Sequence, residues 1–468
     1  MILDHSSYFL LGIKGSAMSN IAVMLTQMGK QVEGVDLPEE YITDCVLHDN
    51  SILFSTDFND LSGVNACEVL VYSAAHEGEH NPLAVEAKKQ GKLVVSQAAL
   101  LGELLAKYDK SLAVAGCHGK TTTASLLAWA LTKLGVNPGY LIGAPPFEGS
   151  GGGKATDSPY FVIEADEYGV HPPTDKTPKL LFLHPAYSIC TNIDFDHPDV
   201  YDSLEATRDV FSQFFKQSKH LVLCADDAVI ASILPLNHPF VVTYGYANGA
   251  DYEAKQSIFE ADRTQFDVYK KGTPLGTFTT HLFGEKNVLN ALGVIALLFE
   301  LGFEGSAIQD AIAGFGGAKR RFELVWTDKT SYLFDDYGHH PAEIEATIAA
   351  ARTRFPDKRL HVLFQPHTFS RTMALKSEFA HALSTADFAY ISPIFPSARE
   401  KKELFHVSSF DVASQARKDT VVAYKNMSNM LSGLASNFQK GDVVFTMGAG
   451  DIYKLKDGII RVLNEKQT

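Results

Sequence analysis

The sequence predicts an α/β protein built on parallel sheets, and three observations support this fold class. Apolar runs typical of buried strands alternate with helical patterns along most of the 468 residues. A strand pattern also leads directly into a glycine-rich turn and a helix at two places, after residues 8–13 and after residues 111–116. The length exceeds the roughly 100–200 residues of one domain. We therefore expect three domains, at residues 1–107, 108–325 and 326–468.

The expected strands follow from short apolar runs rich in β-branched and aromatic residues. In the first domain they occupy residues 8–13, 31–36, 68–74 and 92–96. In the second they occupy residues 111–116, 160–167, 188–194 and 220–226, followed by a β-rich patch at 264–280 and a helix at 287–302. In the third they occupy residues 331–337, 359–366, 388–395, 420–424 and 442–448. Residues 145–159, rich in Gly, Pro and Ser, predict a loop.

The composition and net charge of the chain argue against some classes of binding partner. The chain is 46% hydrophobic and 21% charged, with a formal net charge of −14. This charge argues against a partner that is a nucleic acid or an anionic membrane, but it permits a small anionic ligand. The five cysteines are scattered without a CxxC pair, as expected in a reducing cytosol. With no signal-peptide pattern and no long apolar run, we expect a cytoplasmic protein without membrane insertion.

The stretch AVAGCHGKTTT, which begins at Ala113, predicts a phosphate-binding loop between a strand and a helix. Free N–H groups at the start of a helix bind anions. Lys120 can reach phosphate oxygens, and the Thr121 hydroxyl can bind Mg²⁺. Because Val114 occupies the early glycine position, the match to the Walker pattern is partial. A glycine-rich helix cap with a surface lysine is the alternative.

Two groups of acidic residues follow predicted strands of the same domain. Since the carboxyl ends of parallel strands meet at one edge of a sheet, these groups could hold a metal ion beside the phosphates. Taken singly, each could instead be a solvated loop residue. The two groups are Glu164, Asp166 and Glu167, and Asp194, Asp196 and His197.

The N-terminal stretch GIKGSAM, from Gly12 to Met18, also joins a strand to a helix and precedes Asp36 at the end of the next strand. This order resembles a dinucleotide-binding fingerprint. However, Lys14 and Met18 occupy positions where that fingerprint has glycine. An anion site that suits the diphosphate of a nucleotide sugar is therefore favoured over an NAD site.

Taken together, these motifs resemble those of the Mur ligase family in order along essentially the whole chain. The segments that carry the resemblance are GIKGSAMSNIA (12–22), AGCHGKTTT (115–123), EADEY, TNIDFDHPD, GEKNVLNAL (284–292), GGAKRRFE (316–323), DDYGHHPAE (335–343), FQPHTFSRT from Phe364, SARE (397–400) and GAGDI (448–452). The resemblance implies a Rossmann-like N-terminal domain for a UDP-sugar, a central P-loop ATPase-like domain, and a Rossmann-like C-terminal domain for the amino acid.

The activity implied by the resemblance is ATP- and Mg²⁺-dependent amide formation during synthesis of peptidoglycan precursors. An amino acid, L-alanine by preference, would be joined to the lactyl carboxylate of UDP-N-acetylmuramate through an acyl phosphate. Three alternatives stay open: a recycling ligase that attaches a preformed peptide, a P-loop NTPase that acts as a binding module, and an NAD-dependent oxidoreductase. The oligomeric state is open.

The resemblance also implies roles for individual residues. Catalytic roles fall to Lys120, Glu164, His197, Arg321, Asp336 and His339. ATP contacts fall to Gly116, His118, Gly119, Lys120, Thr121, Thr122, Asn287, Asn290, Arg321 and Asp336, and metal contacts to Thr121, Glu164 and His197. Contacts to the other substrates fall to Gly12, Gly15, Ser16, Met18, Asp36, Ser73, His367 and Arg371. Ordinary structural roles are the alternative, such as a helix cap at His339 or a core position for His367.

Three features depart from the family pattern. Lys14 replaces a glycine, and the segment at 168–186 is longer than usual. Cys117 stands where relatives usually carry threonine. Either its small side chain fills the turn, or the helix N-terminus and His118 lower the pKa of its thiol and make it reactive.

Overall fold

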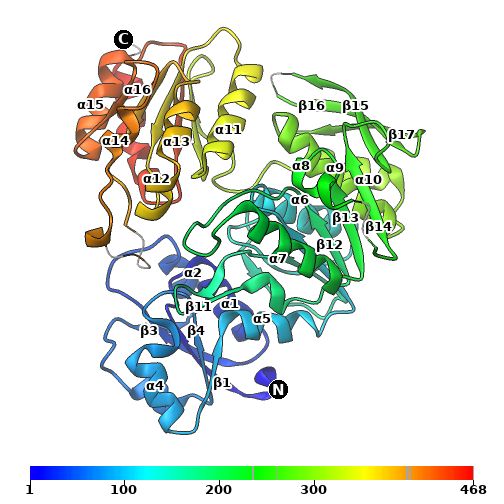
Figure 1. Cartoon of the computed structure of the whole chain (residues 1–468), viewed down its shortest axis with the longest axis vertical. Coiled ribbons are helices and arrows are strands. Elements are labelled where there is room, and N and C mark those ends of the chain that lie inside the picture. The colour runs from blue at the N-terminus through cyan, green and yellow to red at the C-terminus, as the bar shows by residue number, and fades with distance from the viewer. Residues whose placement is uncertain (235–236, 261, 397–399, 401, 467–468) are drawn as a thin grey trace. The chain divides into compact units, whose positions relative to one another are not determined.

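The computed structural model describes residues 1–234, 237–260, 262–396, 400 and 402–466. Its described strands form a five-stranded, a ten-stranded and a six-stranded sheet and one two-stranded hairpin, with helices between them (Figure 1). The predicted α/β class is therefore confirmed. The chain divides into two compact units, residues 1–256, 266–280 and 289–318 in the first, and residues 257–265, 281–288 and 319–468 in the second. The domain boundaries after residues 107 and 325 stay predictions.

The N-terminal sheet has the strand order β3-β2-β1-β4-β5, and all its neighbouring strands run parallel. This order is that of the Rossmann fold. The strands are β1 (Ser7–Leu11), β2 (Gln31–Val35), β3 (Leu53–Ser55), β4 (Val69–Tyr72) and β5 (Leu93–Ser96). The helices are α1 (Ser16–Gln27), α2 (Asp44–Asp49), α3 (Ser62–Ala66), α4 (Pro82–Lys89) and α5 (Gln97–Leu105). Strand residues Phe9, Leu11 and Leu70 pack against Leu83 of α4 in one buried cluster.

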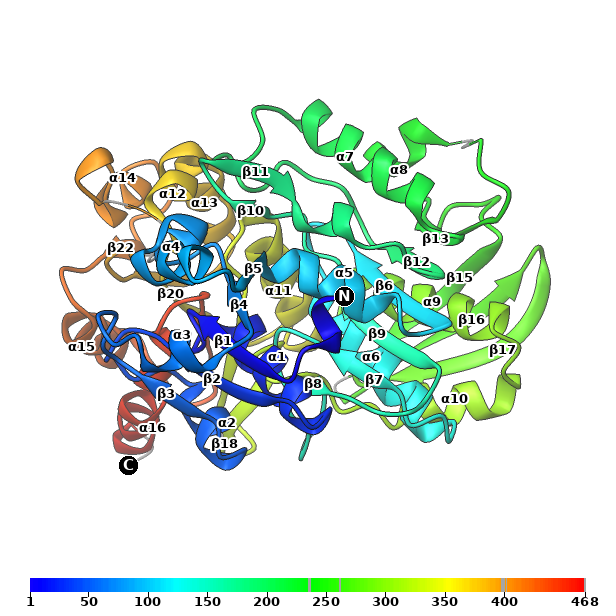
Figure 2. The ribbon, with the colours of Figure 1, turned by 90° about the horizontal axis from the view of Figure 1, so that it is seen from below.

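The ten-stranded sheet has the order β17-β16-β15-β14-β13-β12-β6-β9-β7-β8 (Figure 2). Its strands are β6 (Lys110–Ala115), β7 (Gly139–Leu141), β8 (Gly153–Lys154), β9 (Tyr160–Glu164), β12 (Tyr187–Cys190), β13 (His220–Cys224), β14 (Val241–Gly245), β15 (Tyr252–Phe259), β16 (Thr264–Lys270) and β17 (Thr273–Thr280). From β14 to β7 the neighbours run parallel, with β6 in the interior of the sheet. The carboxyl ends of β6, β9 and β12 therefore lie along one edge, which is where the candidate site is.

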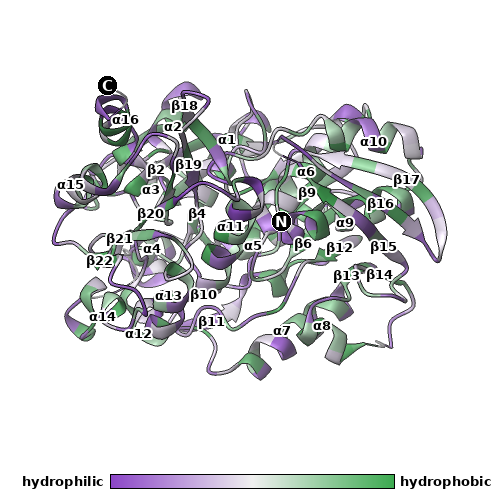
Figure 3. Ribbon diagram, turned by 90° about the horizontal axis from the view of Figure 1, so that it is seen from above, coloured by the Kyte–Doolittle hydropathy of each residue, from purple (hydrophilic) through white to green (hydrophobic). Residues whose placement is uncertain are grey.

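Helices α6 to α10 accompany this sheet. They are α6 (Lys120–Lys133), α7 (Leu204–Gln217), α8 (Ala228–Ile233), α9 (Glu285–Glu300) and α10 (Gly305–Ala313). Helix α6 is buried along most of its length, as expected of a helix without a polar face. Helix α7 is amphipathic (Figure 3), and its buried residues include Phe211, Phe214 and Phe215. The hairpin of β10 (Gly169–His171) and β11 (Asp175–Pro178) follows β9.

The second unit contains a six-stranded sheet with the order β18-β19-β23-β20-β21-β22, in which only β18 is antiparallel to its neighbour. Its strands are β18 (Glu323–Thr327), β19 (Tyr332–Asp336), β20 (Leu360–Phe364), β21 (Phe388–Ile391), β22 (Val421–Ala423) and β23 (Val443–Met447). Helices α11 (Pro341–Arg354), α13 (Lys376–Leu383) and α14 (Ser409–Ala413) contribute to one buried cluster. Helices α15 (Met427–Asn437) and α16 (Lys456–Glu465) contribute to another.

The remaining short helices are α12 (Phe369–Ala374) and five 3₁₀ turns, η1 (Ile2–Asp4), η2 (Gly78–His80), η3 (Lys179–Phe182), η4 (Lys402–Leu404) and η5 (Ile452–Leu455). The two clusters place helices on both faces of the second unit's sheet, so this unit is doubly wound. The predicted parallel-sheet architecture is confirmed here as well.

Candidate active site

The glycine-rich loop after β6 has the backbone that a phosphate site needs. Gly116 and Gly119 have φ angles of 130° and 82°, a region that favours glycine. An added Cβ would lie 2.1 Å from the Thr191 hydroxyl oxygen at Gly116, and 2.9 Å from the Asn290 amide oxygen at Gly119. The loop thus leaves no room for side chains at these two positions, and α6 begins at Lys120.

Lys120 is held by three acceptors within the first unit. Its ammonium group donates to the carbonyl oxygens of Gly116 (2.6 Å) and Cys117 (3.2 Å). The third acceptor is the Glu167 carboxylate, at 2.7 Å. Burial is the largest single effect and lowers the pKa of Lys120, but the Glu167 and Asp166 carboxylates and the other contacts together outweigh it, and the net shift is upward. Lys120 is therefore a cation at any physiological pH.

Thr121 and Glu164 form a second group beside the loop. The Thr121 hydroxyl donates to one Glu164 carboxylate oxygen at 3.1 Å, and the other accepts from the Gly143 N–H at 2.7 Å. Hydroxyl and carboxylate oxygens are the ligands that Mg²⁺ prefers. The donor atoms of these two side chains therefore fit the predicted metal contact.

His197 lies with the acidic residues that follow β9 and β12. Its Nε2 atom is 3.5 Å from Glu167 and 3.7 Å from Asp196. The Tyr168 ring meets the imidazole edge-on, with centroids 4.8 Å apart. His197 has a φ of 58°, which is uncommon for a residue with a side chain. Such a conformation persists only where the surroundings hold it, and it is frequent at functional sites.

Three of the other predicted nucleotide contacts lie at the same loop. The His118 N–H donates to the Asn192 side chain at 2.9 Å, and its ring nitrogen lies 3.1 Å from the Asp194 carboxylate. Thr122 is buried in the first turn of α6. Asn290, on α9, is the side chain nearest to Gly119 in the contact described above. Asn287, one turn earlier on α9, belongs to the second unit and donates to the Phe283 carbonyl at 2.9 Å.

The N-terminal glycine-rich loop is organised around Asp36. One of its oxygens accepts from the Lys14 N–H at 2.8 Å, and the other accepts from the Leu37 N–H at 2.8 Å and contacts the His76 ring at 2.9 Å. Gly12 has a φ of 83°, and an added Cβ would lie 2.8 Å from the Ser73 hydroxyl. The structure thus brings Gly12, Asp36 and Ser73 to one loop cluster.

Three more residues of this predicted sugar site lie at the start of α1. Gly15 caps the helix, and the Ser16 hydroxyl donates to the Gly143 carbonyl beyond the N-terminal sheet. The Met18 side chain is buried, at 2% exposure, in the core. Lys14 is also buried, at 3% exposure, and forms an ion pair with Asp44 at 3.2 Å. The Lys14 side chain therefore holds the segment after β2.

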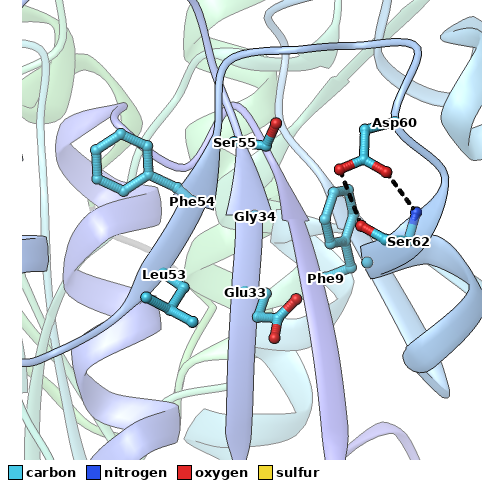
Figure 4. Close-up of a pocket in the computed structure, with 9 residues that line it drawn as sticks. Phe9, Glu33, Gly34, Leu53, Phe54, Ser55, Asp60 and Ser62 are labelled. Atoms are coloured by element: carbon cyan, nitrogen blue, oxygen red, sulfur yellow. Dashed lines mark hydrogen bonds between the residues drawn. The ribbon is translucent and has the colours of Figure 1, made fainter.

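A cavity of about 180 Å³ lies on the β2–β3 side of the N-terminal sheet (Figure 4). Its lining residues are Phe9, Glu33, Gly34, Leu53, Phe54, Ser55, Asp60, Ser62 and Gly63. Figure 4 shows the Asp60 carboxylate accepting two hydrogen bonds from Ser62, both at 2.9 Å. None of the lining residues is one of the predicted substrate contacts.

The structure settles the two hypotheses for Cys117. Its thiol is buried, donates to the Asp194 carbonyl and accepts from the Asp194 N–H, both at 3.2 Å. Burial, followed by the negative charge of Glu167, raises the pKa of the Cys117 thiol well above its ordinary value. The hypothesis of a lowered pKa is wrong, because burial and Glu167 outweigh the opposing effects of Lys120 and the Asp194 N–H. Cys117 is a small buried residue that ties the loop to β12.

In the second unit, three predicted residues gather at the end of β19. Asp336 accepts from the Phe322 N–H at 2.8 Å and the Gly338 N–H at 2.7 Å. Burial raises the pKa of Asp336 to about 6, against the opposing effect of Arg321. The Arg321 guanidinium lies 5.0 Å from the centroid of the Tyr337 ring. The His339 ring contacts the Tyr337 carbonyl at 3.1 Å.

The predicted amino-acid contacts lie in the same unit. The rings of His367 and His339 are 6.2 Å apart, and His367 also stacks on Phe395. Arg371 lies on α12 and is only 4% exposed, a burial that an arginine tolerates only when paired or hydrogen-bonded. The Glu400 carboxylate accepts from the N–H of Phe369 at 2.6 Å. The other three residues of the SARE motif, 397–399, lie outside the described residues.

Sequence reasoning placed Glu167 in an acidic group that could hold a metal ion but did not predict its contact with Lys120, and it missed His76 and the partners of Lys14. Only Glu167 had a local signal, since it ends the EADE stretch three residues after Glu164. The contacts of His76 with Asp36 and of Lys14 with Asp44 link residues 30 to 40 positions apart, as 44 − 14 = 30 and 76 − 36 = 40. No local pattern shows such pairs.

Family models match three consecutive parts of the chain. They are described as "Mur ligase family, catalytic domain" at residues 8–109, "Mur ligase middle domain" at 114–298, and "Mur ligase, glutamate ligase domain" at 320–450. The first two matched regions contain the glycine-rich loops, and the third contains Asp336 and Arg371. Within the described residues, no helix combines the length and hydrophobicity needed to cross a bilayer.

Full-length relatives agree with these matches. The UDP-N-acetylmuramate–L-alanine ligase of Lactococcus lactis subsp. cremoris is 35% identical over 465 residues, 99% of each chain. The enzyme of that name from Pediococcus pentosaceus is 38% identical over 456 residues, 97% of this chain and 98% of the relative. The crystal structure of the UDP-N-acetylmuramate-alanine ligase from Thermotoga maritima aligns with a TM-score of 0.79 at 25% identity, covering 98% of this chain and 100% of that one. This chain belongs to the Mur ligase family.

Proposed function

We propose that this chain is an ATP-dependent ligase that joins L-alanine to the lactyl carboxylate of UDP-N-acetylmuramate in the synthesis of peptidoglycan precursors. The observation that carries the proposal is the full-length identity to enzymes named UDP-N-acetylmuramate–L-alanine ligase. The loop geometry supports it, since Lys120, Thr121 and Glu164 lie together at the start of α6, beside a glycine-rich loop. We further propose that it acts in the cytoplasm.

The proposed reaction has two steps. An oxygen of the substrate carboxylate attacks the γ-phosphorus of ATP, and the bond from that phosphorus to the bridging oxygen breaks, releasing ADP. The amine of the amino acid then attacks the acyl carbon, loses a proton, and expels inorganic phosphate. Negative charge accumulates on the transferring phosphoryl group in the first step, so fixed positive charge there lowers the barrier.

The residues of the first unit would divide the work as follows. The backbone of Gly116 and Gly119 would approach the phosphates, and the Lys120 ammonium would neutralise the phosphoryl group. Thr121 and Glu164, with His197 as a further ligand, would hold Mg²⁺, which supplies charge stabilisation when bound. The N-terminal loop at Gly12, Gly15 and Ser73 would receive the diphosphate of the sugar nucleotide.

The second unit would contribute the amino-acid site. Arg371 would grip the α-carboxylate through two N–H donors, since its guanidinium matches a carboxylate. His367 would lie beside it, and Arg321, Asp336 and His339 would serve the ATP. Asn287 and Asn290 would face the adenine, because a side-chain amide offers both a donor and an acceptor.

The test is phosphate release from ATP with a panel of UDP-sugars and acceptors. We expect release only when UDP-N-acetylmuramate and an amino acid are both present, with L-alanine preferred over glycine and L-serine. A tripeptide acceptor that works where L-alanine fails would indicate the recycling ligase. Phosphate release that ignores the acceptor would indicate an NTPase and refute the proposal.

A further inference from the structure

Glu167 is the most deeply buried acidic group at the phosphate loop, at 1% exposure. One of its carboxylate oxygens accepts from Lys120 at 2.7 Å, and the other is 3.5 Å from the His197 ring nitrogen. The Tyr201 hydroxyl donates to its carbonyl oxygen, which fixes the backbone at this point. Nothing in the proposed reaction uses this carboxylate.

All donor atoms of Lys120 are engaged in this arrangement. An ammonium group has three N–H donors, and here they meet Gly116, Cys117 and Glu167. A phosphate oxygen can therefore be contacted only if one of these acceptors is released. Glu167 is the acceptor that a phosphate would replace, because the triphosphate brings negative charge to a site where Glu167 already supplies it.

Release of Lys120 leaves Glu167 in an unfavourable position. A buried carboxylate that loses its cation is strongly destabilised, because the partner that compensated its charge is gone. The approaching triphosphate adds to this repulsion. A cation that enters together with the nucleotide would relieve both effects.

We propose that Glu167 is a displaceable counter-ion of Lys120. Because of it, ATP binding depends on a divalent cation more strongly than it would if the cation only neutralised the triphosphate. The inference rests on the proposed role of Lys120 at the phosphates. By linkage, ATP would increase the affinity for the cation by the same factor as the cation increases the affinity for ATP. Glu167 is thus a positioning residue that acts through Lys120.

The test is calorimetric titration of ATP into the whole enzyme, once with Mg²⁺ and once with EDTA. Glu167→Gln keeps the shape and one acceptor for Lys120 but removes the charge. We expect it to tighten metal-free ATP binding by about tenfold or more, as removal of a repulsive charge a few ångströms from a phosphate should do. The ratio of the two dissociation constants should fall accordingly. Unchanged or weaker metal-free binding would overturn the proposal.

Two variants serve as controls. Asp166→Asn removes the same charge one residue away, but Asp166 pairs with Lys179 at 2.9 Å and is 42% exposed. The Asp166 charge also acts on Lys120, but it is paired with Lys179 and partly exposed to solvent, so metal-free ATP binding should change less than with Glu167→Gln, by about threefold at most. Glu167→Asp retains the charge and should retain the cation dependence of the wild type. A response of Asp166→Asn equal to that of Glu167→Gln would assign the effect to overall charge and refute the specific role.

A structure of the wild-type enzyme with Mg²⁺ and a non-hydrolysable ATP analogue keeps the proposal testable if Glu167→Gln does not fold. We expect the Lys120 ammonium on a phosphate oxygen and beyond hydrogen-bonding distance from Glu167. If Lys120 and Glu167 were still in contact in this complex, the inference would be overturned. Failure of the premise that Lys120 acts at the phosphates looks different, since ATP would then bind equally to the wild type and to Lys120→Ala. Failure of the proposed ligase function is read separately, from phosphate release that ignores the acceptor.

Discussion

Replacement of Lys120 by methionine should affect stability and catalysis through different partners, and the two effects can be separated. The side chain keeps its length and apolar stem, but the ammonium group is lost. Glu167, at 1% exposure, then has no cation at 2.7 Å. Removal of one partner of a buried ion pair costs about 3–5 kcal/mol. Since domains are usually stable by about 5–15 kcal/mol, the variant should fold but unfold at lower urea concentration.

The catalytic effect of Lys120→Met has another origin. The ammonium group that would neutralise the transferring phosphoryl group is gone, so turnover should fall by a factor on the order of 10² or more. The double variant Lys120→Met/Glu167→Gln removes both charges, and it should recover most of the lost stability, because no unpaired charge stays buried. It should not recover turnover.

The assays are urea unfolding followed by circular dichroism, and coupled phosphate release at saturating substrates. Lys179→Met is a matched control, because Lys179 pairs with the more exposed Asp166 and its replacement should cost less stability than that of Lys120. Near-normal turnover of Lys120→Met would refute the phosphate-loop assignment. Equal stability of the single and double variants would refute the account of the buried pair.

The other predictions concern Arg371, Cys117 and Asp336. Arg371→Lys should raise the KM for the amino acid about tenfold and leave the KM for ATP nearly unchanged, because lysine lacks the planar fork; parallel changes in both constants would contradict this. Iodoacetamide should label exposed Cys45 well before Cys117, with or without Mg-ATP, and the Cys117→Thr variant should stay active. If mass spectrometry detected rapid labelling of Cys117, this would contradict its raised pKa. Carbon-13 NMR should show Asp336 titrating near pH 6. Since the pKa of Asp336 is raised from 3.8 to about 6, the native state binds the proton more tightly than the unfolded chain does. The free energy of unfolding should therefore fall by about 3 kcal/mol as the pH rises through this interval, and it should stay lower above it. A titration of Asp336 near pH 4 would contradict this.

The predicted strands of the central sheet are buried along most of their length. The apolar runs at 111–116 and 160–167 correspond to β6 and β9, and the helix expected at 287–302 is α9, shifted by two residues. Strand β9 ends at Glu164, so the acidic residues beyond it lie in a loop, where carboxylates can point into a site. The periodicity of apolar residues finds such elements because burial, a local requirement of the sequence, determines them.

Several of the strands that were not predicted are short and polar. The hairpin strand β11 reads Asp-Lys-Thr-Pro, and β8 has two residues, Gly153 and Lys154. Neither has an apolar pattern, because each exists through pairing with one neighbour and not through its own burial. The β10–β11 hairpin explains why the segment at 168–186 is long, although its sequence gave no strand signal.

Asp36 shows why a motif can be located in the sequence although the role of its residues cannot be predicted from it. An acidic residue at the end of the second strand of a Rossmann unit commonly binds a ribose hydroxyl, which is why the stretch resembled a dinucleotide site. In the structure its two oxygens already contact Lys14, Leu37 and His76. A ribose would compete with these groups for the carboxylate. The side chain of Lys14 meanwhile points to Asp44 and the Glu39 carbonyl, and not to a place where it would meet a phosphate within this loop. Lys14, which departs from the glycine fingerprint, therefore anchors the segment from Asp36 to Asp44, and the contacts of Asp36 hold the loop together.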